Sequence, residues 1–368
     1  MTGKILFNGN MGSLSLLMQR VRPFIHGKCL MVTAAWGPGE LGDAPIREAL
    51  NAVGIPSDWR GGYDQNIKNL CAWHSWNAYL QRHPHVARVE KEMQLVGAET
   101  RGFYLEKTSF HSRRVRHAVR SARSRIPGFS LGGLPTVPRD ALRPEATLGG
   151  KELLGWALTR ELVHELGDLT QHDARMMEAL AEVEGAVATR TGLCFDPDWQ
   201  EQRRTLEGRI LEADTIFLLG GEPGELLGAL RFFDLKGALQ ETLRRGAVVV
   251  AISAGSLVLC ERMIVYNDYA PEPEKREFRL FDRGLGIVGG LQILPHCMDR
   301  IQTDDADNLA YLARRFSSHA CVGLNEESFL LVDLEKGSAT SVGVRDGVYV
   351  FGADGVKRCY HQGEAIPL

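Results

Sequence analysis

A chain of 368 residues is long enough for two or three domains, or for one elaborated α/β domain. Hydrophobic residues make up 44% of the chain and charged residues 24%, a composition that excludes disordered, collagen-like and coiled-coil proteins. The net charge of −3 provides no global attraction to nucleic acid or to an anionic membrane, so a partner of either kind would need a local patch.

No stretch of the sequence approaches the ~18 uninterrupted apolar residues of a membrane span, and its first ten residues lack the pattern of a signal peptide. We therefore expect a cytoplasmic protein without a membrane partner. The seven cysteines are scattered and include no C-x-x-C pair, which predicts reduced thiols and no metal or redox site.

The first sixty residues are predicted to form two strands and a helix. Lys4–Phe7 is a short apolar run, Cys29–Ala34 is typical of a buried strand, and Ala44–Val53 is an amphipathic helix ended by Gly54. Such an order is typical of the start of a doubly wound sheet.

Between about residues 63 and 204 the strand pattern is missing and helical periodicity replaces it. The expected helices are Asn66–Leu80, Val86–Val96, Lys151–Leu166 and Gln171–Ala188. A stretch rich in glycine and proline, residues 127–144, separates the first pair from the second and is predicted to be a loop or a partly mobile linker. This region is expected to be a helical insertion.

After Asp214 the α/β pattern returns. It predicts a strand in TIFLLGG (215–221), a helix over 226–245, a strand in AVVVAIS (247–253), and later strands at 291–294, 321–324 and 328–332 with a helix over 305–316. Asp-Gly pairs at 346–347 and 354–355 predict hairpins. The expected fold is α/β, a doubly wound and mostly parallel sheet, formed by residues 1–60 and 205–368 and interrupted by the insertion at 61–204.

Ser253 occupies a position typical of a nucleophile. The sequence Ala-Ile-Ser-Ala-Gly (251–255) lies between an all-apolar strand and a helix-like segment, and a serine at such a turn has an exposed hydroxyl. The alternative is that Ser253 only caps the following helix. Gly221, at the end of the preceding strand, and Ala254 could supply the N–H groups of an oxyanion hole.

His296 and Glu326, later in the chain, could complete a catalytic triad with Ser253. His296 and Glu326 each follow a predicted strand, so a base and a carboxylate are expected at the same edge as Ser253. The order Ser, His, Glu is compatible with acyl transfer.

The stretches ADTIFLLGG, GALQETLRRGAVVVAISAGS, GLGIVGG, ILPH and VGLNEES together resemble the serine peptidases that include dipeptidase E and cyanophycinase. The resemblance is strong over residues 209–333 and implies the class I glutamine amidotransferase-like fold. It also implies that Ser253 is the nucleophile and His296 its general base. Glu326 matches the acidic position of the family pattern and is favoured as the third member, while Asp268 matches an aspartate of the dipeptidase E branch.

The sequence departs from this family at positions expected to contact substrate. Glu222 stands where the family has an amide side chain, and Arg300 is kept but is followed by Asp304 and Asp305. These acids predict a preference for a basic or neutral residue beside the scissile bond and argue against simple aspartyl dipeptides.

No cofactor is expected. The G-x-G-x-x-G pattern at 284–289 follows a charged loop and precedes a strand, whereas a dinucleotide site needs the reverse order. Residues 107–125 contain seven Lys and Arg and no acid. This basic run, Arg113–Arg125 in particular, is interpreted either as a helix face paired with acidic neighbours or as a docking surface for an anionic partner.

The sequence therefore predicts a serine hydrolase that cleaves a peptide or isopeptide amide through an acyl-enzyme. Two alternatives remain open: hydrolysis or transfer of a non-peptide amide, and a binding or regulatory module that keeps the fold without turnover. The oligomeric state does not follow from the sequence.

Overall fold

The computed structural model describes residues 2–10, 12–55, 67–135, 149–269, 277–343 and 347–368. In these residues an eight-stranded sheet has the order β14-β11-β10-β1-β5-β4-β2-β3. Strands β1, β5, β4, β2 and β3 are parallel, and β10, β11 and β14 add an antiparallel edge. The bounds are β1 Lys4–Asn8, β2 Cys29–Val32, β3 Lys68–Asn69, β4 Thr215–Leu218, β5 Val248–Ile252, β10 Ser328–Asp333, β11 Ser338–Gly343 and β14 Ala365–Ile366.

Helices cover both faces of this sheet, because alternate residues of its buried strands point to opposite sides. In β5, Val249 and Ala251 belong to a core shared with helices on one face, and Val250 and Ile252 to a core shared with α1 and α2 on the other. The doubly wound α/β fold is confirmed. The covering helices are α1 Leu14–Val21 and α2 Ala44–Ala52 on one face, and α3 Ala72–Arg82, α6 Pro197–Leu211, α7 Pro223–Phe232, α8 Lys236–Arg244 and α9 Ala254–Leu259 on the other.

A second, smaller sheet has the order β13-β12-β9-β8 and includes the parallel pair β8 and β9. Its bounds are β8 Leu291–Pro295, β9 Ala320–Leu324, β12 Val348–Phe351 and β13 Lys357–Tyr360, with α10 Cys297–Arg300 and α11 Ala306–Arg315 between β8 and β9. Strands β6 Arg262–Asn267 and β7 Glu277–Arg283 pair with each other alone among the described residues. The separation of β8 and β9 from the main sheet was not expected from the sequence.

Several expected elements need correction. The helix expected over 226–245 is two helices, α7 and α8, separated by a turn in which Asp234 has φ of 49°. Helix α1 was missed, and β3 lies where no strand was expected. The hairpin expected at residues 346–347 is wrong, since β11 and β12 belong to different sheets; Asp346 itself lies outside the described residues. The hairpin at Asp354 and Gly355 is confirmed by the β12–β13 pair.

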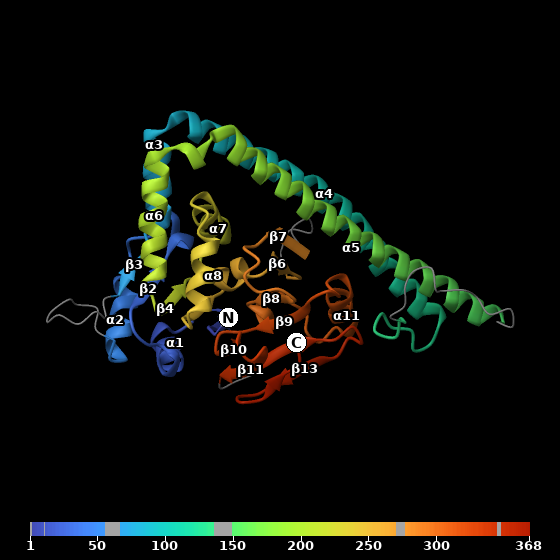
Figure 1. The fold of residues 1–368 in the computed structure, drawn as a ribbon. Coiled ribbons are helices and arrows are strands. Elements are labelled where there is room, and N and C mark those ends of the chain that lie inside the picture. Colours follow the sequence, from blue (N-terminus) through green and yellow to red (C-terminus); the bar gives the residue numbers. More distant parts are fainter. Residues whose placement is uncertain (1, 11, 56–66, 136–148, 270–276, 344–346) are drawn as a thin grey trace.

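Two helices of 42 residues each dominate the region between β3 and β4: α4 Pro84–Arg125 and α5 Gly150–Thr191. They lie side by side as an antiparallel pair, here called the helical hairpin (Figure 1). Short 3₁₀ turns stand elsewhere in the chain, at η1 Arg22–Phe24, η2 Ala34–Gly39 and η4 Leu193–Phe195. The hairpin shares a hydrophobic core with β6, β7 and α11, so it is packed against the α/β part. The domain boundaries drawn above stay a prediction.

Candidate active site

Ser253 lies at a sharp turn between β5 and α9. Its φ of 48° and ψ of −103° are unusual for a residue with a side chain, as expected for a strained strand-to-helix turn. The neighbours are small for steric reasons: a Cβ on Gly255 would stand 2.1 Å from Leu218 O, and one on Gly220 would stand 3.2 Å from Ser253 Cβ. The crowded backbone thus explains the small residues around the serine.

His296 follows β8 of the smaller sheet and faces Ser253 across the boundary between the sheets. The distance from its Nε2 to Ser253 Oγ is 3.0 Å. Gly9, directly after β1, joins the two sheets, because His296 N donates to Gly9 O at 3.3 Å. A Cβ on Gly9 would stand 2.1 Å from Leu324 O at the end of β9, so only glycine fits there. The structure therefore brings the serine and the histidine within hydrogen-bond distance.

The surroundings of His296 favour its neutral form. Burial lowers the pKa of the imidazole, and the neighbouring Arg300 guanidinium lowers it further, while the Asp299 carboxylate acts in the opposite direction. A neutral imidazole can accept a proton from a serine hydroxyl, which is what a general base requires. Sequence reasoning did not include Asp299 among the site residues, although its position three residues after His296 could have suggested it.

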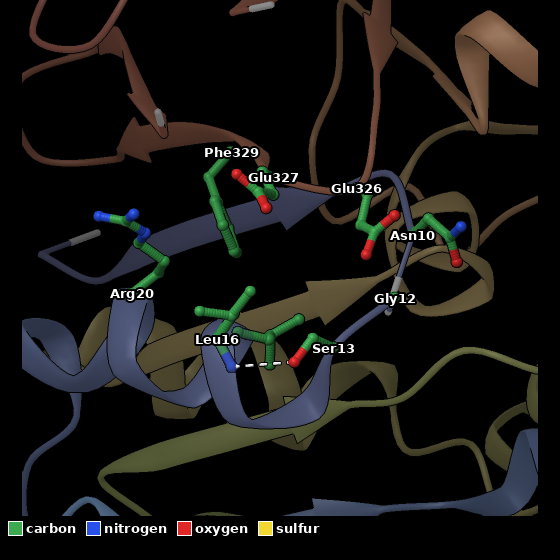
Figure 2. Close-up of a pocket in the computed structure, with 9 residues that line it drawn as sticks. Asn10, Gly12, Ser13, Leu16, Arg20, Glu326, Glu327 and Phe329 are labelled. Carbon is green, nitrogen blue, oxygen red and sulfur yellow. Dashed lines mark hydrogen bonds between the residues drawn. The ribbon is translucent and has the colours of Figure 1, made fainter. Parts of the chain in front are cut away.

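The two candidate acids, Glu326 and Asp268, differ in their surroundings. The side chain of Glu326 is exposed and faces the segment after β1, where a Cβ on Gly12 would collide with its carboxylate (Figure 2). The Asp268 carboxylate accepts hydrogen bonds of 2.8 Å each from Tyr266 Oη, Gln302 N and Asn308 Nδ2. Within the described residues, neither acid forms a hydrogen bond or an ion pair with the imidazole.

Asn8 is a buried polar residue that sequence reasoning missed. Its Nδ2 donates to Glu326 O at 2.8 Å and to Ser328 O at 3.0 Å, and its own carbonyl accepts from Ser253 N and Ser256 Oγ, both at 2.9 Å. Asn8 is fully buried, so these bonds are made without competition from water. It links the serine turn to the turn that carries Glu326. In the sequence, the only sign of this role is that an asparagine ends the apolar run of β1.

The two expected oxyanion donors lie at neighbouring strand ends. β4 and β5 are adjacent and parallel, with Leu218 opposite Ala251, so Gly221 and Ala254 follow strands that end at the same edge. Gly221 has φ of 146°, and a Cβ there would stand 2.5 Å from Ala35 O. The N–H of Ala254 is the first in α9 and has no acceptor within that helix.

The residues expected to contact substrate have different surroundings. Glu222 is exposed directly before α7 and next to Gly221. Arg300 is half-buried in α10, and burial lowers its pKa. The Asp305 carboxylate caps α11 by accepting from the first N–H groups of the helix, and Asp304 is exposed with Lys357 Nζ at 3.6 Å. Of the three acids, only Glu222 has neither a capping role nor a basic partner among the described residues.

The basic run Arg113–Arg125 forms the last part of α4 and is partly neutralised. Three of its arginines pair with carboxylates on neighbouring elements, at distances of 2.6–2.9 Å. The pairs are Arg114 with Glu165, Arg116 with Glu277, and Arg123 with Asp307. This favours the interpretation of these three as a helix face paired with acidic neighbours.

No helix among the described residues is long and apolar enough to cross a membrane. The same residues contain no group of three or more His, Cys, Asp or Glu side chains placed to hold a metal ion.

The comparisons with known proteins bear on the part of the chain that carries this site. Residues 197–340 match the model of peptidase family S51. This match confirms the resemblance drawn from the sequence, and it includes Ser253, His296 and both candidate acids. Family S51 is a family of serine peptidases, so the matched region is that of a peptidase hydrolase. A solved peptidase from an acI-B1 Actinobacterium aligns with 100% of this chain and 98% of its own, at 12% identity and a TM-score of 0.47. The search of curated proteins found no match.

Proposed function

We propose that this S51 protein cleaves a peptide or isopeptide amide bond through an acyl-enzyme formed on Ser253. The observation that carries the proposal is the distance of 3.0 Å between Ser253 Oγ and His296 Nε2, at a strained turn inside the matched region. A hydroxyl within hydrogen-bond reach of a neutral imidazole is the arrangement that nucleophilic catalysis by serine needs.

In the proposed reaction, Ser253 Oγ attacks the carbonyl carbon of the scissile amide while His296 Nε2 accepts the hydroxyl proton. The N–H groups of Gly221 and Ala254 would stabilise the oxyanion. When the tetrahedral intermediate collapses, the C–N bond breaks and His296 returns the proton to the leaving amine. Water then attacks the ester carbonyl while His296 accepts a proton from it. When the second tetrahedral intermediate collapses, the bond between the carbonyl carbon and Ser253 Oγ breaks, His296 returns its proton to Oγ and the carboxylic acid is released.

The first experiment is labelling with a fluorophosphonate probe, which reacts with activated serines. Wild-type protein should be labelled, and Ser253→Ala should not be labelled and should lose hydrolysis by several orders of magnitude. Ser256→Ala serves as the matched control, because Ser256 lies in the same segment but its hydroxyl is buried and bonded to backbone carbonyls. Folded Ser256→Ala protein should still be labelled by the fluorophosphonate probe. Absence of labelling in the folded wild type would favour a binding module instead.

For the third member of the triad we propose Glu326 over Asp268. The Asp268 carboxylate already holds three hydrogen bonds, whereas the Glu326 side chain is exposed on a turn that Asn8 ties to the serine turn. Glu326→Gln should therefore lower kcat by about 10⁴, the order expected when the imidazole loses its orienting acid. Asp268→Asn should cost far less, and the reverse ranking would transfer the role to Asp268.

We also propose that the substrate carries a basic or neutral residue beside the scissile bond. Glu222 supports this, since it is exposed next to Gly221, whereas Asp304 lies near Lys357 and Asp305 caps a helix. In a peptide panel, Glu222→Gln should reduce the ratio of kcat/KM for basic over neutral residues by about 5- to 10-fold, which corresponds to roughly 1 kcal/mol. Asp304→Asn is the matched control and should leave the ratio unchanged. A wild-type preference for aspartyl dipeptides would contradict the proposal.

A further inference from the structure

The outer side of α4 carries large apolar side chains that are more than 40% exposed, although the Arg114 guanidinium lies over the Phe110 ring, 5.7 Å from its centroid. The helix is 42 residues long, about 63 Å at 1.5 Å per residue. Its inner side is buried, for example at Val115 and Val119, but Leu95 is 60% exposed, Val96 41%, Phe103 62% and Phe110 52%. A single exposed apolar residue is ordinary, whereas several on one helix face indicate an interaction surface.

These side chains have the spacing of a helix seam. Val96, Phe103 and Phe110 recur every seven residues, which places them in one row along the helix. Figure 1 shows α4 extended beside α5. The inner side of α4 packs against α5 and the α/β part, and the row lies on its outer side. A second helix could therefore pack along the row.

The exposed charges nearest Phe103 on this side have opposite signs before and after it. The acid Glu99 lies four residues before Phe103, and the base Lys107 lies four residues after it. Glu99 and Lys107 form no ion pair within the described residues. The sign of the surface charge thus changes close to Phe103.

This pattern is self-complementary if a second copy of α4 runs antiparallel. With a two-fold axis beside Phe103, that residue packs against Phe103 of the second copy, and Val96 faces Phe110 of the second copy. Glu99 then faces Lys107 of the second copy, and the reverse pair forms on the other side of the axis. A parallel arrangement would place Glu99 against its own equivalent, which is repulsive.

We propose that this protein forms a two-fold symmetric dimer through the outer side of α4, with the two helices antiparallel and centred on Phe103. The dimer is independent of the reaction proposed for Ser253. The occupant is a second copy of this chain because both the apolar row and the charges match their own two-fold image.

The test measures the oligomeric state by sedimentation velocity and light scattering over a range of concentrations. Wild-type protein should be dimeric, and Phe103→Glu should raise the dissociation constant at least about 100-fold, since each substitution acts twice across the axis. Phe195→Glu is the matched control: Phe195 is 84% exposed but lies in η4, outside the proposed surface, and its substitution should change nothing. A folded wild type that stays monomeric up to its solubility limit would overturn the proposal.

Charge reversal tests the register. Glu99→Lys and Lys107→Glu should each raise the dissociation constant about 10-fold or more, because each places like charges opposite one another. The double variant E99K/K107E should recover dimerisation, since the opposite pairs are restored with exchanged signs. Both sites are exposed, so circular dichroism should show folded protein in every variant. A double variant as weak as the two single ones would overturn the register.

Cysteine cross-linking tests the direction of the helices. Phe103→Cys should cross-link to itself with a short bifunctional reagent. Val96→Cys should not, because its equivalents would lie about 21 Å apart along the axis. A mixture of Val96→Cys and Phe110→Cys proteins should give the cross-linked pair. Wild-type protein is the control, because it shows how much cross-linking occurs through the exposed Cys194 and Cys359 alone. Cross-linking of Val96→Cys to itself would overturn the antiparallel arrangement.

Discussion

Replacing Asp173 by Asn should loosen the attachment of the helical hairpin to the α/β part. Asp173 in α5 accepts two hydrogen bonds from Arg315 in α11, at 2.8 Å from Nε and 2.6 Å from Nη2. Both side chains are at least 99% buried, and Arg315 also donates to Tyr311 Oη and packs over the Phe278 ring at 4.3 Å. Although burial opposes the guanidinium charge, Asp173 raises the pKa of Arg315 above its ordinary value.

The size of the effect follows from this burial. Asp173→Asn keeps the shape of the side chain but removes the carboxylate that is hydrogen-bonded to the buried Arg315 charge, which costs about 3–5 kcal/mol. Asp173→Leu combined with Arg315→Leu removes both charges and should recover most of that loss, because the burial cost of the ions disappears with them. The matched control is Glu212→Gln, whose ion pair with Lys68 is more than half exposed and should contribute at most about 1 kcal/mol.

The assay is urea unfolding followed by circular dichroism, combined with hydrogen exchange of the amides in α5. Asp173→Asn should lower the free energy of unfolding and speed exchange along α5 near residue 173, while Glu212→Gln should change neither. A loss below about 1 kcal/mol for Asp173→Asn, equal to that of the exposed pair, would refute the reasoning that the buried pair anchors the hairpin.

Further predictions concern the serine site. Since burial lowers the pKa of His296, the rate of fluorophosphonate labelling should fall to half its maximum at a pH below 6.5, the ordinary pKa of histidine, as the imidazole becomes protonated. Arg300→Gln should move this fall in the labelling rate to higher pH, because the Arg300 cation disfavours the imidazolium. Asp299→Asn should move it to lower pH, because the Asp299 carboxylate favours the imidazolium. Shifts in the opposite directions would contradict the assignment of His296 as the base. Gly221→Ala should reduce the labelling rate at least about 10-fold, because its Cβ would stand 2.5 Å from a backbone oxygen in η2, whereas Gly224→Ala, with only a side-chain atom at 3.8 Å, should be neutral.

The sequence alone determined several local elements of the α/β part and the position of the serine. The all-apolar run that forms β5, followed by small residues, is visible within ten positions, and so are α11 and the β12–β13 hairpin with its Asp-Gly turn. These features depend on periodicity and turn chemistry, which neighbouring residues encode. The family resemblance, confirmed over residues 197–340, likewise rests on short stretches in a fixed order.

The tertiary structure decided what depends on contacts between distant residues. Ser253 and His296 belong to different sheets, and Gly9 and Asn8, more than 240 positions before the serine, join those sheets. The expected helix Val86–Val96 is extended to become α4, and the expected helices Lys151–Leu166 and Gln171–Ala188 merge into α5. Helix α5 continues through Gly167 because packing along the two helices outweighs a propensity cost of about 1 kcal/mol per glycine. Side-chain approach and packing depend on the whole fold, and a local pattern does not encode them.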